Sequence, residues 1–125
     1  MKTNELTGVA LDWAVAKCEK LDVHTDYVGV GTREWGVFVD FSNDYCNVHY
    51  QPSKHWGWGG PIIEREKIDL RWDVTFEYPD DGVWFASIDP SDEVITATTP
   101  LVAAMRCYVA SKLGGEIDVP EELTK

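Results

Sequence analysis

The residues best suited to chemistry or binding lie between Tyr50 and Pro61, in the stretch YQPSKHWGWGGP. Tryptophans flanked by small residues can form an exposed contact for a protein partner. The commoner arrangement places such tryptophans over a sheet as part of the core, yet this stretch is the best candidate site in the chain. We interpret it as a glycine-rich loop. The candidate partner-binding residues of the loop and its rim are Tyr50, Ser53, His55, Trp56, Trp58, Glu64 and Arg65.

Metal binding and nucleophilic catalysis are the next possibilities, because Cys46, His49 and His55 fall within ten positions. A structural zinc site normally has four ligands, often in close pairs, and the chain offers no second pair. Cys107 is expected to be buried in the last helix, where a thiol is inert. No cysteine or histidine stands in a recognisable catalytic motif. The sequence therefore predicts no metal site and no catalytic residue.

The glycines of Gly57–Gly60 precede a predicted helix and could cradle a phosphate. Their spacing matches neither the dinucleotide fingerprint nor the P-loop. Glu64 and Glu66 follow in the helix and would oppose an anion. We predict no cofactor, and we keep a small-ligand enzyme with a pocket beside Gly57–Pro61 as an alternative function.

Charge narrows the choice of partner. The chain has 125 residues and a net charge of -11, from 22 acidic and 11 basic residues, which opposes direct binding of a nucleic-acid backbone. An acidic surface usually serves solubility, but it also permits a basic partner or mimicry of nucleic acid on a host protein. The segment MKTNELTG lacks the apolar core of a signal peptide, and no apolar run could span a bilayer. These features predict a cytoplasmic protein with no membrane association and with reduced cysteines.

The elements that position the candidate site begin and end with two helices. The first is predicted from about Gly8 to Lys20, with Thr7 as its N-cap and with Asp12 facing water. The last is predicted over Thr99–Gly114, because a capping threonine and a proline open it and a glycine closes it. One edge of its broad apolar face is predicted to contain Leu101, Met105, Tyr108 and Lys112, with Val102, Val109 and Leu113 beside them.

Between these helices the pattern indicates strands. Predicted extended or strand segments and their turns are Tyr27–Val30, Gly36–Phe41, Asn47–Tyr50, Asp69–Tyr78, Val83–Ile88 and Val94–Thr98, with turns at Ser42–Asp44, Pro79–Gly82 and Asp89–Asp92. In Asp69–Tyr78, alternation places Leu70, Trp72, Val74 and Phe76 on one face. A short middle helix should begin at Pro61. The fold class is therefore α+β: an antiparallel sheet of about four to five strands, packed by the terminal helices and the middle helix. Residues 1–125 form one predicted domain, with 115–125 as a loosely ordered acidic tail.

Three blocks of the chain resemble the NinX-like family of small phage proteins. They are ELTGVALDWAVAKCE at 5–19, GGPIIERE at 59–66 and TPLVAAMRCYVASKLG at 99–114. The resemblance implies a phage or prophage origin, an intracellular location in the host bacterium, and an architecture similar to phage α-β-α sandwich domains. It supplies no catalytic residues, because the family has no assigned function. The family usually carries a proline-serine-threonine-aspartate run before the glycines, where this chain has Pro52–His55, PSKH.

The favoured hypothesis is a non-enzymatic accessory protein that binds a host or phage protein through Tyr50–Gly60, with acidic residues tuning the encounter rate. The alternatives are an acidic inhibitor or nucleic-acid mimic acting on a host protein, and the small-ligand enzyme described above. A structural role, such as a dimer through an exposed sheet edge, is a further possibility. The sequence leaves the partner and the oligomeric state open.

Overall fold

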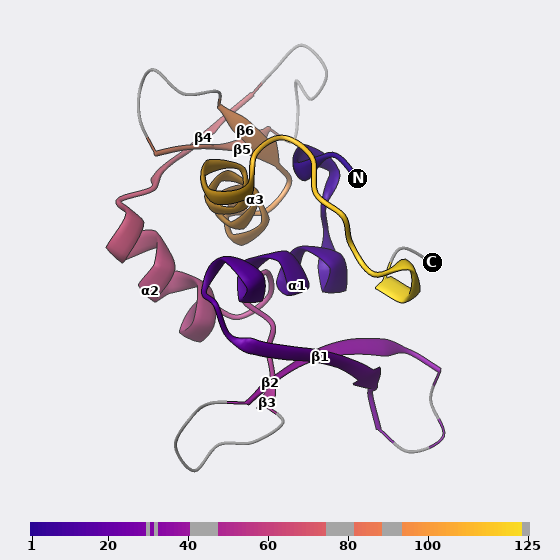
Figure 1. Ribbon diagram of the computed structural model, residues 1–125. Helices are drawn as coiled ribbons and strands as arrows, with labels where there is room; N and C mark the ends of the chain where they lie inside the picture. Colours follow the sequence, from indigo (N-terminus) through magenta and orange to yellow (C-terminus); the bar gives the residue numbers. More distant parts are fainter. Residues whose placement is uncertain (30, 32, 41–47, 75–81, 89–93, 124–125) are drawn as a thin grey trace.

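Two three-stranded antiparallel sheets lie on opposite sides of a pair of helices (Figure 1). This computed structural model describes residues 1–29, 31, 33–40, 48–74, 82–88 and 94–123. The first sheet, in the order β1-β2-β3, contains β1 Asp22–Tyr27, β2 Trp35–Asp40 and β3 Val48–His49. The second, in the order β4-β5-β6, contains β4 Asp69–Asp73, β5 Val83–Ser87 and β6 Ile95–Ala97.

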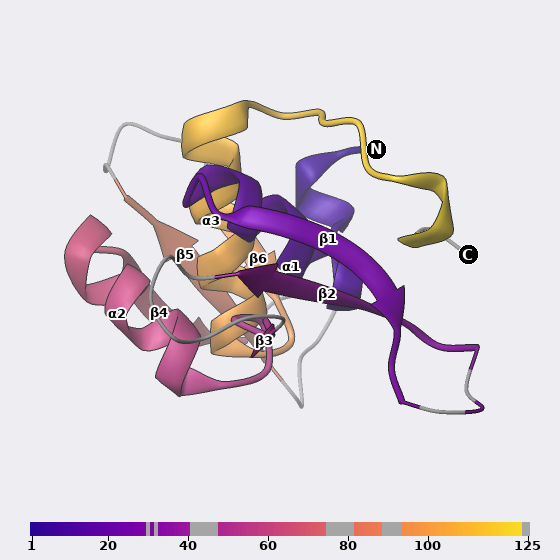
Figure 2. The ribbon, with the colours of Figure 1, turned by 60° about the horizontal axis from the view of Figure 1, so that its bottom comes forward.

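The helices separate these sheets. The α-helices are α1 Gly8–Cys18, α2 Trp56–Glu66 and α3 Pro100–Leu113, and short 3-10 helices occur at η1 Thr3–Glu5 and η2 Glu121–Leu123. α1 contacts β1 and β2, α3 contacts all three strands of the second sheet, and α1 and α3 contact each other. Figure 2 shows β1 and β2 crossing over α1. The layers are therefore sheet, helix, helix, sheet, with α2 beside α3.

The single sheet of four to five strands expected from the sequence is wrong, although the α+β class and the antiparallel pairing are confirmed. β2 pairs with β1 and β3, while β5 pairs with β4 and β6. The helix α2 stands between β3 and β4 along the chain, so each half of the sequence pairs its own strands. The first extended segment is also displaced, because β1 ends at Tyr27, where the predicted segment begins.

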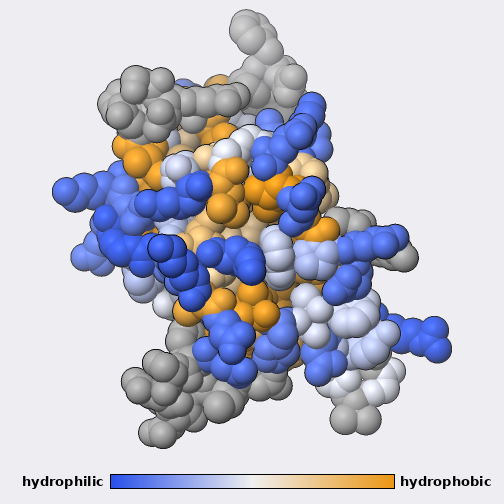
Figure 3. All heavy atoms as spheres, in the orientation of Figure 1, coloured by the Kyte–Doolittle hydropathy of each residue, from blue (hydrophilic) through white to orange (hydrophobic). Residues whose placement is uncertain are grey.

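One hydrophobic core joins the two halves. It includes buried residues of both terminal helices and of β2, β5 and β6, such as Leu11, Val39, Ala86, Ile95 and Met105. Figure 3 shows hydrophilic side chains over most of one face, with hydrophobic side chains visible between them near its centre. The predicted apolar face of β4 is only partly correct.

On β4, Leu70 packs against the core, but Trp72 and the following Val74 are 51% and 48% exposed. Trp72 lies instead over Gly82, where an added Cβ would meet the indole at 2.5 Å. Phe76 and the turns predicted at 42–44 and 89–92 lie outside the described residues, as does the turn predicted at 79–82 except for Gly82.

The terminal helix α3 follows its sequence signals closely. Thr99 Oγ1 accepts a hydrogen bond from the Val102 N–H at 3.3 Å, and Pro100 occupies the first turn. Gly114 ends the helix with φ at +89°, a conformation that favours glycine. The predicted apolar face is confirmed at Leu101, Met105, Tyr108 and Val109, which are all buried, but its last turn is exposed at Lys112 and Leu113.

The first helix departs from expectation at Asp12. Thr7 precedes α1 as predicted, but its side chain makes no capping hydrogen bond. Asp12 was expected to face water, and it is instead 1% exposed. Its Oδ1 accepts a hydrogen bond from the Ser53 N–H at 2.9 Å. Helical periodicity cannot anticipate a backbone donor that arrives 41 residues later.

The C-terminal tail is joined to the start of the chain. Thr3 donates hydrogen bonds to the carbonyls of Gly114 and Gly115, and the Met1 ammonium donates to the Ile117 carbonyl at 2.9 Å. Leu123, in η2, is buried. The looseness predicted for 115–125 concerns motion and stays a prediction, but the described part of this tail packs against the domain.

Candidate functional site

The segment predicted as a glycine-rich loop is helical, which changes the geometry of the candidate site. α2 begins at Trp56, five residues before the predicted start at Pro61, so the tryptophans and glycines form its first turns. An added Cβ at Gly59 would come within 2.6 Å of Leu101 Cδ2 and 2.7 Å of the Pro52 carbonyl oxygen. Glycine here therefore serves close packing of α2 against α3, which outweighs its low helix propensity.

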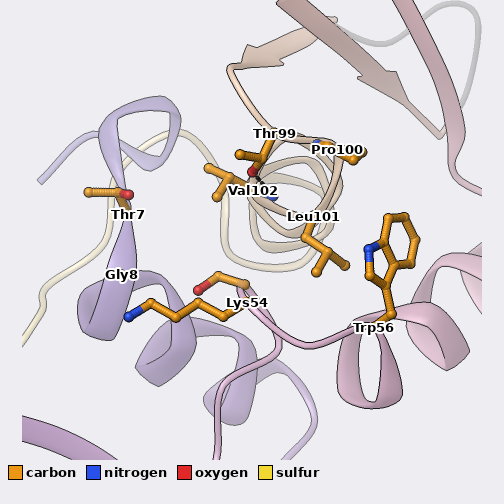
Figure 4. Close-up of a pocket in the computed structure, with 9 residues that line it drawn as sticks. Thr7, Gly8, Lys54, Trp56, Thr99, Pro100, Leu101 and Val102 are labelled. Carbon is orange, nitrogen blue, oxygen red and sulfur yellow. Dashed lines mark hydrogen bonds between the residues drawn. The ribbon is translucent and has the colours of Figure 1, made fainter.

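A cavity of about 430 Å³ lies where all three α-helices begin (Figure 4). We call it the Trp56 pocket. Its lining consists of Thr7, Gly8, Ser53, Lys54, Trp56, Thr99, Pro100, Leu101 and Val102. In Figure 4 the side chains of Trp56 and Leu101 lie beside each other on one wall, and Lys54 lies between them and the start of α1. The pocket is mostly apolar.

The two tryptophans of α2 have different roles. Trp56 is 54% exposed and lines the Trp56 pocket. Trp58 is half-buried against the core, with its ring edge-to-face to Tyr50 at a centroid distance of 5.2 Å. Tyr50 is buried, and this burial raises the pKa of its hydroxyl. Of the predicted aromatic pair, Trp56 is thus exposed at the pocket, while Trp58 packs against the core.

A buried carboxyl holds the wall of the Trp56 pocket that carries Ser53 and Lys54. The hydrogen bond from the Ser53 N–H to Asp12 joins this segment to α1. Burial raises the pKa of Asp12 to about 6, and the hydrogen bonds from Ser53 and the charge of Lys54 offset part of this rise. Asp12 was not among the predicted site residues. The signal available in the sequence was only a charged residue at a helix position flanked by Leu11 and Ala14, which are both fully buried.

The remaining predicted residues do not all share the pocket. His55 is exposed at the start of α2, and its Nε2 lies 3.2 Å from Gln51 Oε1. Glu64 and Arg65 stand in the last turn of α2, at the opposite end of the helix from Trp56. The structure therefore splits the predicted set between the two ends of α2.

At this second end, polar side chains satisfy one another. Arg65 donates from Nη1 and Nη2 to Glu19, at 3.0 and 2.7 Å, and Tyr108 OH donates to Glu19 Oε2 at 2.7 Å. Glu66 accepts from Arg65 Nε at 2.9 Å and lies 3.4 Å from Lys112 Nζ. These hydrogen bonds raise the pKa of Arg65 and lower that of Glu66. We call these five residues the helix-end network, and its contacts join the C-terminal ends of α1, α2 and α3.

The chemistry available in the Trp56 pocket is limited. Among the described residues that line it, none is a histidine, cysteine or carboxylate, and Thr99 is engaged in capping α3. Within the described ranges, no three His, Cys, Asp or Glu residues lie close enough together to hold a metal ion. Cys46 lies outside those ranges. The arrangement suits the binding of an apolar group.

The fold and this pocket define a small α+β protein with an open apolar cavity at the start of its helices. A family model described as bacteriophage P22 NinX matches residues 2–112, and the chain belongs to this family. It is therefore a phage accessory protein of the NinX family. No curated protein matches the chain. Within the described residues, no helix is both long enough and apolar enough to cross a membrane.

Proposed function

We propose that the chain is a non-enzymatic module that binds a host or phage protein inside the bacterial cell. The contact is the Trp56 pocket, into which the partner inserts an apolar side chain. The observation that carries this proposal is the exposure of Trp56, which is 54% exposed beside a cavity walled by Leu101 and Val102. Tryptophan at the rim of an apolar pocket is a frequent energetic centre of protein interfaces.

The support beneath Trp56 favours a prepared surface. Trp58 packs on Tyr50, and Gly59 allows α2 to approach α3 closely. Asp12 holds the Ser53 segment on the opposite wall. A surface that is already ordered loses little conformational entropy when a partner binds.

The absence of an enzymatic role is part of the proposal. It is supported by the residues around the Trp56 pocket, since neither a general base nor a metal-ligating side chain lies among the described residues of its lining. An alternative small-ligand enzyme would need such a group beside the start of α2, where the lining supplies Lys54 and hydroxyl side chains.

Affinity capture from infected cells tests the proposal. Baits carrying the wild-type chain, Trp56→Ala or Trp72→Ala are compared by quantitative mass spectrometry after infection with the phage that encodes the protein. Trp72 is a matched control, because it is 51% exposed and lies on β4 of the second sheet. A partner retained by wild type and Trp72→Ala, but reduced more than about tenfold by Trp56→Ala, is the expected result.

Melting temperatures of the three baits must agree within a few degrees for this comparison. Equal recovery of every captured protein by wild type and Trp56→Ala would reject the Trp56 pocket as the contact. The double replacement of Trp56 and Trp58 is unsuitable, because Trp58 also packs against the core.

A further inference from the structure

A second cavity adjoins the Trp56 pocket and extends it into a groove. This cavity, of about 240 Å³, shares Thr7 and Val102 with the first. We call it the Arg106 pocket, and its lining consists of Thr7, Val83, Thr96, Ala97, Thr98, Val102 and Arg106. The groove therefore passes from Trp56, past Thr7 and Val102, which line both cavities, to Arg106.

Arg106 is half-buried and has no carboxylate partner within the described part of the chain. Its Nε donates to the Leu6 carbonyl at 2.6 Å, and its Nη1 donates to the Thr96 carbonyl at 3.0 Å. Burial lowers the pKa of Arg106, against the opposing field of Glu5. A guanidinium has five N–H donors, so the two bonds to carbonyls leave donors for a ligand in the Arg106 pocket.

The groove also has an unusual charge for this chain. The protein contains 22 Asp and Glu residues, yet neither lining includes one, whereas Lys54 lies in the Trp56 pocket and Arg106 in its neighbour. Lys54 forms no salt bridge with any described residue. By contrast, both basic residues of the helix-end network, Arg65 and Lys112, pair with carboxylates. The groove thus combines apolar walls with two cations that form no salt bridge with a described carboxylate, although Glu5 lies near enough to act on Arg106 and Asp12 near enough to interact with Lys54.

We infer that this groove binds an acidic segment of the partner protein, with a carboxylate on Arg106 and a neighbouring apolar side chain in the Trp56 pocket. The inference rests on the proposed function and names the chemistry of the partner. A carboxylate and a guanidinium form short, charge-assisted hydrogen bonds that fix the orientation of the bound segment. A nucleic-acid strand is less favoured, because its affinity depends on neutralising many phosphates and the groove offers only two cations.

A displayed library of random twelve-residue peptides supplies the probe. It is selected on the full wild-type chain, and enriched peptides are synthesised with a fluorophore for anisotropy measurements. Enrichment of Asp or Glu within four positions of Leu, Ile, Phe or Trp is expected. Replacing that acidic residue with its amide should weaken binding roughly tenfold, because charge-assisted hydrogen bonds are about twice as strong as neutral ones. This replacement leaves the protein unchanged, so it is independent of folding.

Protein variants place the contact. Arg106→Gln should weaken the acidic peptide roughly tenfold and leave its amide counterpart nearly unaffected. Arg71→Gln, which makes the same charge change on β4, where Arg71 lies over the Phe85 ring, should leave both unchanged. If Arg106→Gln fails to fold, Lys54→Gln and the peptide series provide the same comparison at the other cation.

The outcomes separate the two proposals. Peptides that lose binding in Trp56→Ala but ignore the amide replacement overturn the acidic segment and keep the Trp56 pocket. Peptides that bind equally to wild type and Trp56→Ala, or a library without enrichment, overturn both. A single-stranded oligonucleotide of twenty thymidines that binds wild type and loses binding in Arg106→Gln would show that the groove recognises nucleic acid instead.

Discussion

The N-terminal and C-terminal ends of the three α-helices differ in whether their charged side chains form ion pairs. Where α1, α2 and α3 begin, the groove carries Lys54 and Arg106 without carboxylates among its described lining residues. At their other ends, the helix-end network pairs every charge it contains. Cations near helix C-termini complement the helix dipole, whereas cations near helix N-termini oppose it. This difference indicates that the cations at the N-terminal ends of the helices lie in an unfavourable electrostatic environment. A bound carboxylate would relieve it.

The largest expected effect is the pH dependence of stability caused by Asp12, which holds one wall of the Trp56 pocket. Its pKa in the folded protein is about 6, above the ordinary value of 3.8. The protonated carboxyl therefore favours folding, and its contribution is complete below pH 4 and lost as the pH rises through 6. Relative to Asp12→Asn, the wild-type free energy of unfolding should fall by about 2.5 kcal/mol between pH 4 and pH 7.

Urea denaturation of both proteins at half-unit pH steps measures this difference, since the other carboxyls contribute equally to the two curves. Parallel curves for wild type and Asp12→Asn would show that the carboxyl is solvated rather than buried against Ser53.

The next effect concerns the spacing between α2 and α3 beside the Trp56 pocket. Gly59→Ala places a Cβ against Leu101 and the Pro52 carbonyl, and overpacking should lower the free energy of unfolding by about 2 kcal/mol. Gly57→Ala is the matched control, because an added Cβ there meets nothing within 4 Å. This control should stabilise the helix by roughly 0.5 to 1 kcal/mol. Equal effects of the two replacements in chemical denaturation would disprove the close packing.

In the helix-end network, Tyr108→Phe removes the hydroxyl that donates to Glu19 and accepts from Arg65 Nη2. Tyr108 is 2% exposed and its partners are charged, so the loss should be about 1.5 kcal/mol. Lys112→Ala breaks an exposed contact of the same network and should cost less than about 0.5 kcal/mol. Thermal and urea unfolding measure both variants. Equal losses of stability would contradict the buried hydrogen bonds of Tyr108 in the helix-end network.

The smallest effect distinguishes two threonines at helix starts. Thr99→Ala removes the acceptor of the Val102 N–H and should cost about 1 kcal/mol. Thr7→Ala should change stability by no more than about 0.5 kcal/mol, because Thr7 makes no capping hydrogen bond. Differential scanning calorimetry can compare them, and a larger loss for Thr7→Ala would mean that its hydroxyl has a role at α1 that the contacts do not explain.

The terminal helices could be predicted because their signals are local. Thr99, Pro100 and Gly114 mark α3 within sixteen residues, and each has the expected position. The start of α2 could not be predicted, because tertiary contact with Leu101 overrides the low helix propensity of Gly59. Local sequence patterns therefore fail to predict an element whose conformation depends on a contact with a residue far along the chain.

The same limit explains the sheets and the candidate site. Composition, turn signals and, for β4, alternation predicted strands at the positions of β2 to β6, but these patterns do not encode which strands pair. Of the predicted site residues, Trp56 lines the Trp56 pocket, whereas Arg65 stands at the opposite end of α2. Arg106 and Asp12 could not be predicted as site residues, because their positions depend on hydrogen bonds to backbone groups far along the chain. These groups are the Leu6 carbonyl for Arg106 and the Ser53 N–H for Asp12.

The layer order has a consequence for how the chain would come apart. Among the described residues, the named strands pair only within residues 22–49 or within 69–97, and the two groups meet through α1 and α3, which both contain fully buried alanines, such as Ala14 and Ala104. Prying these helices apart, for example with Ala104→Leu, should leave two hairpin-and-helix units that each retain slow amide exchange. The molecule is expected to divide at this seam before either half unravels.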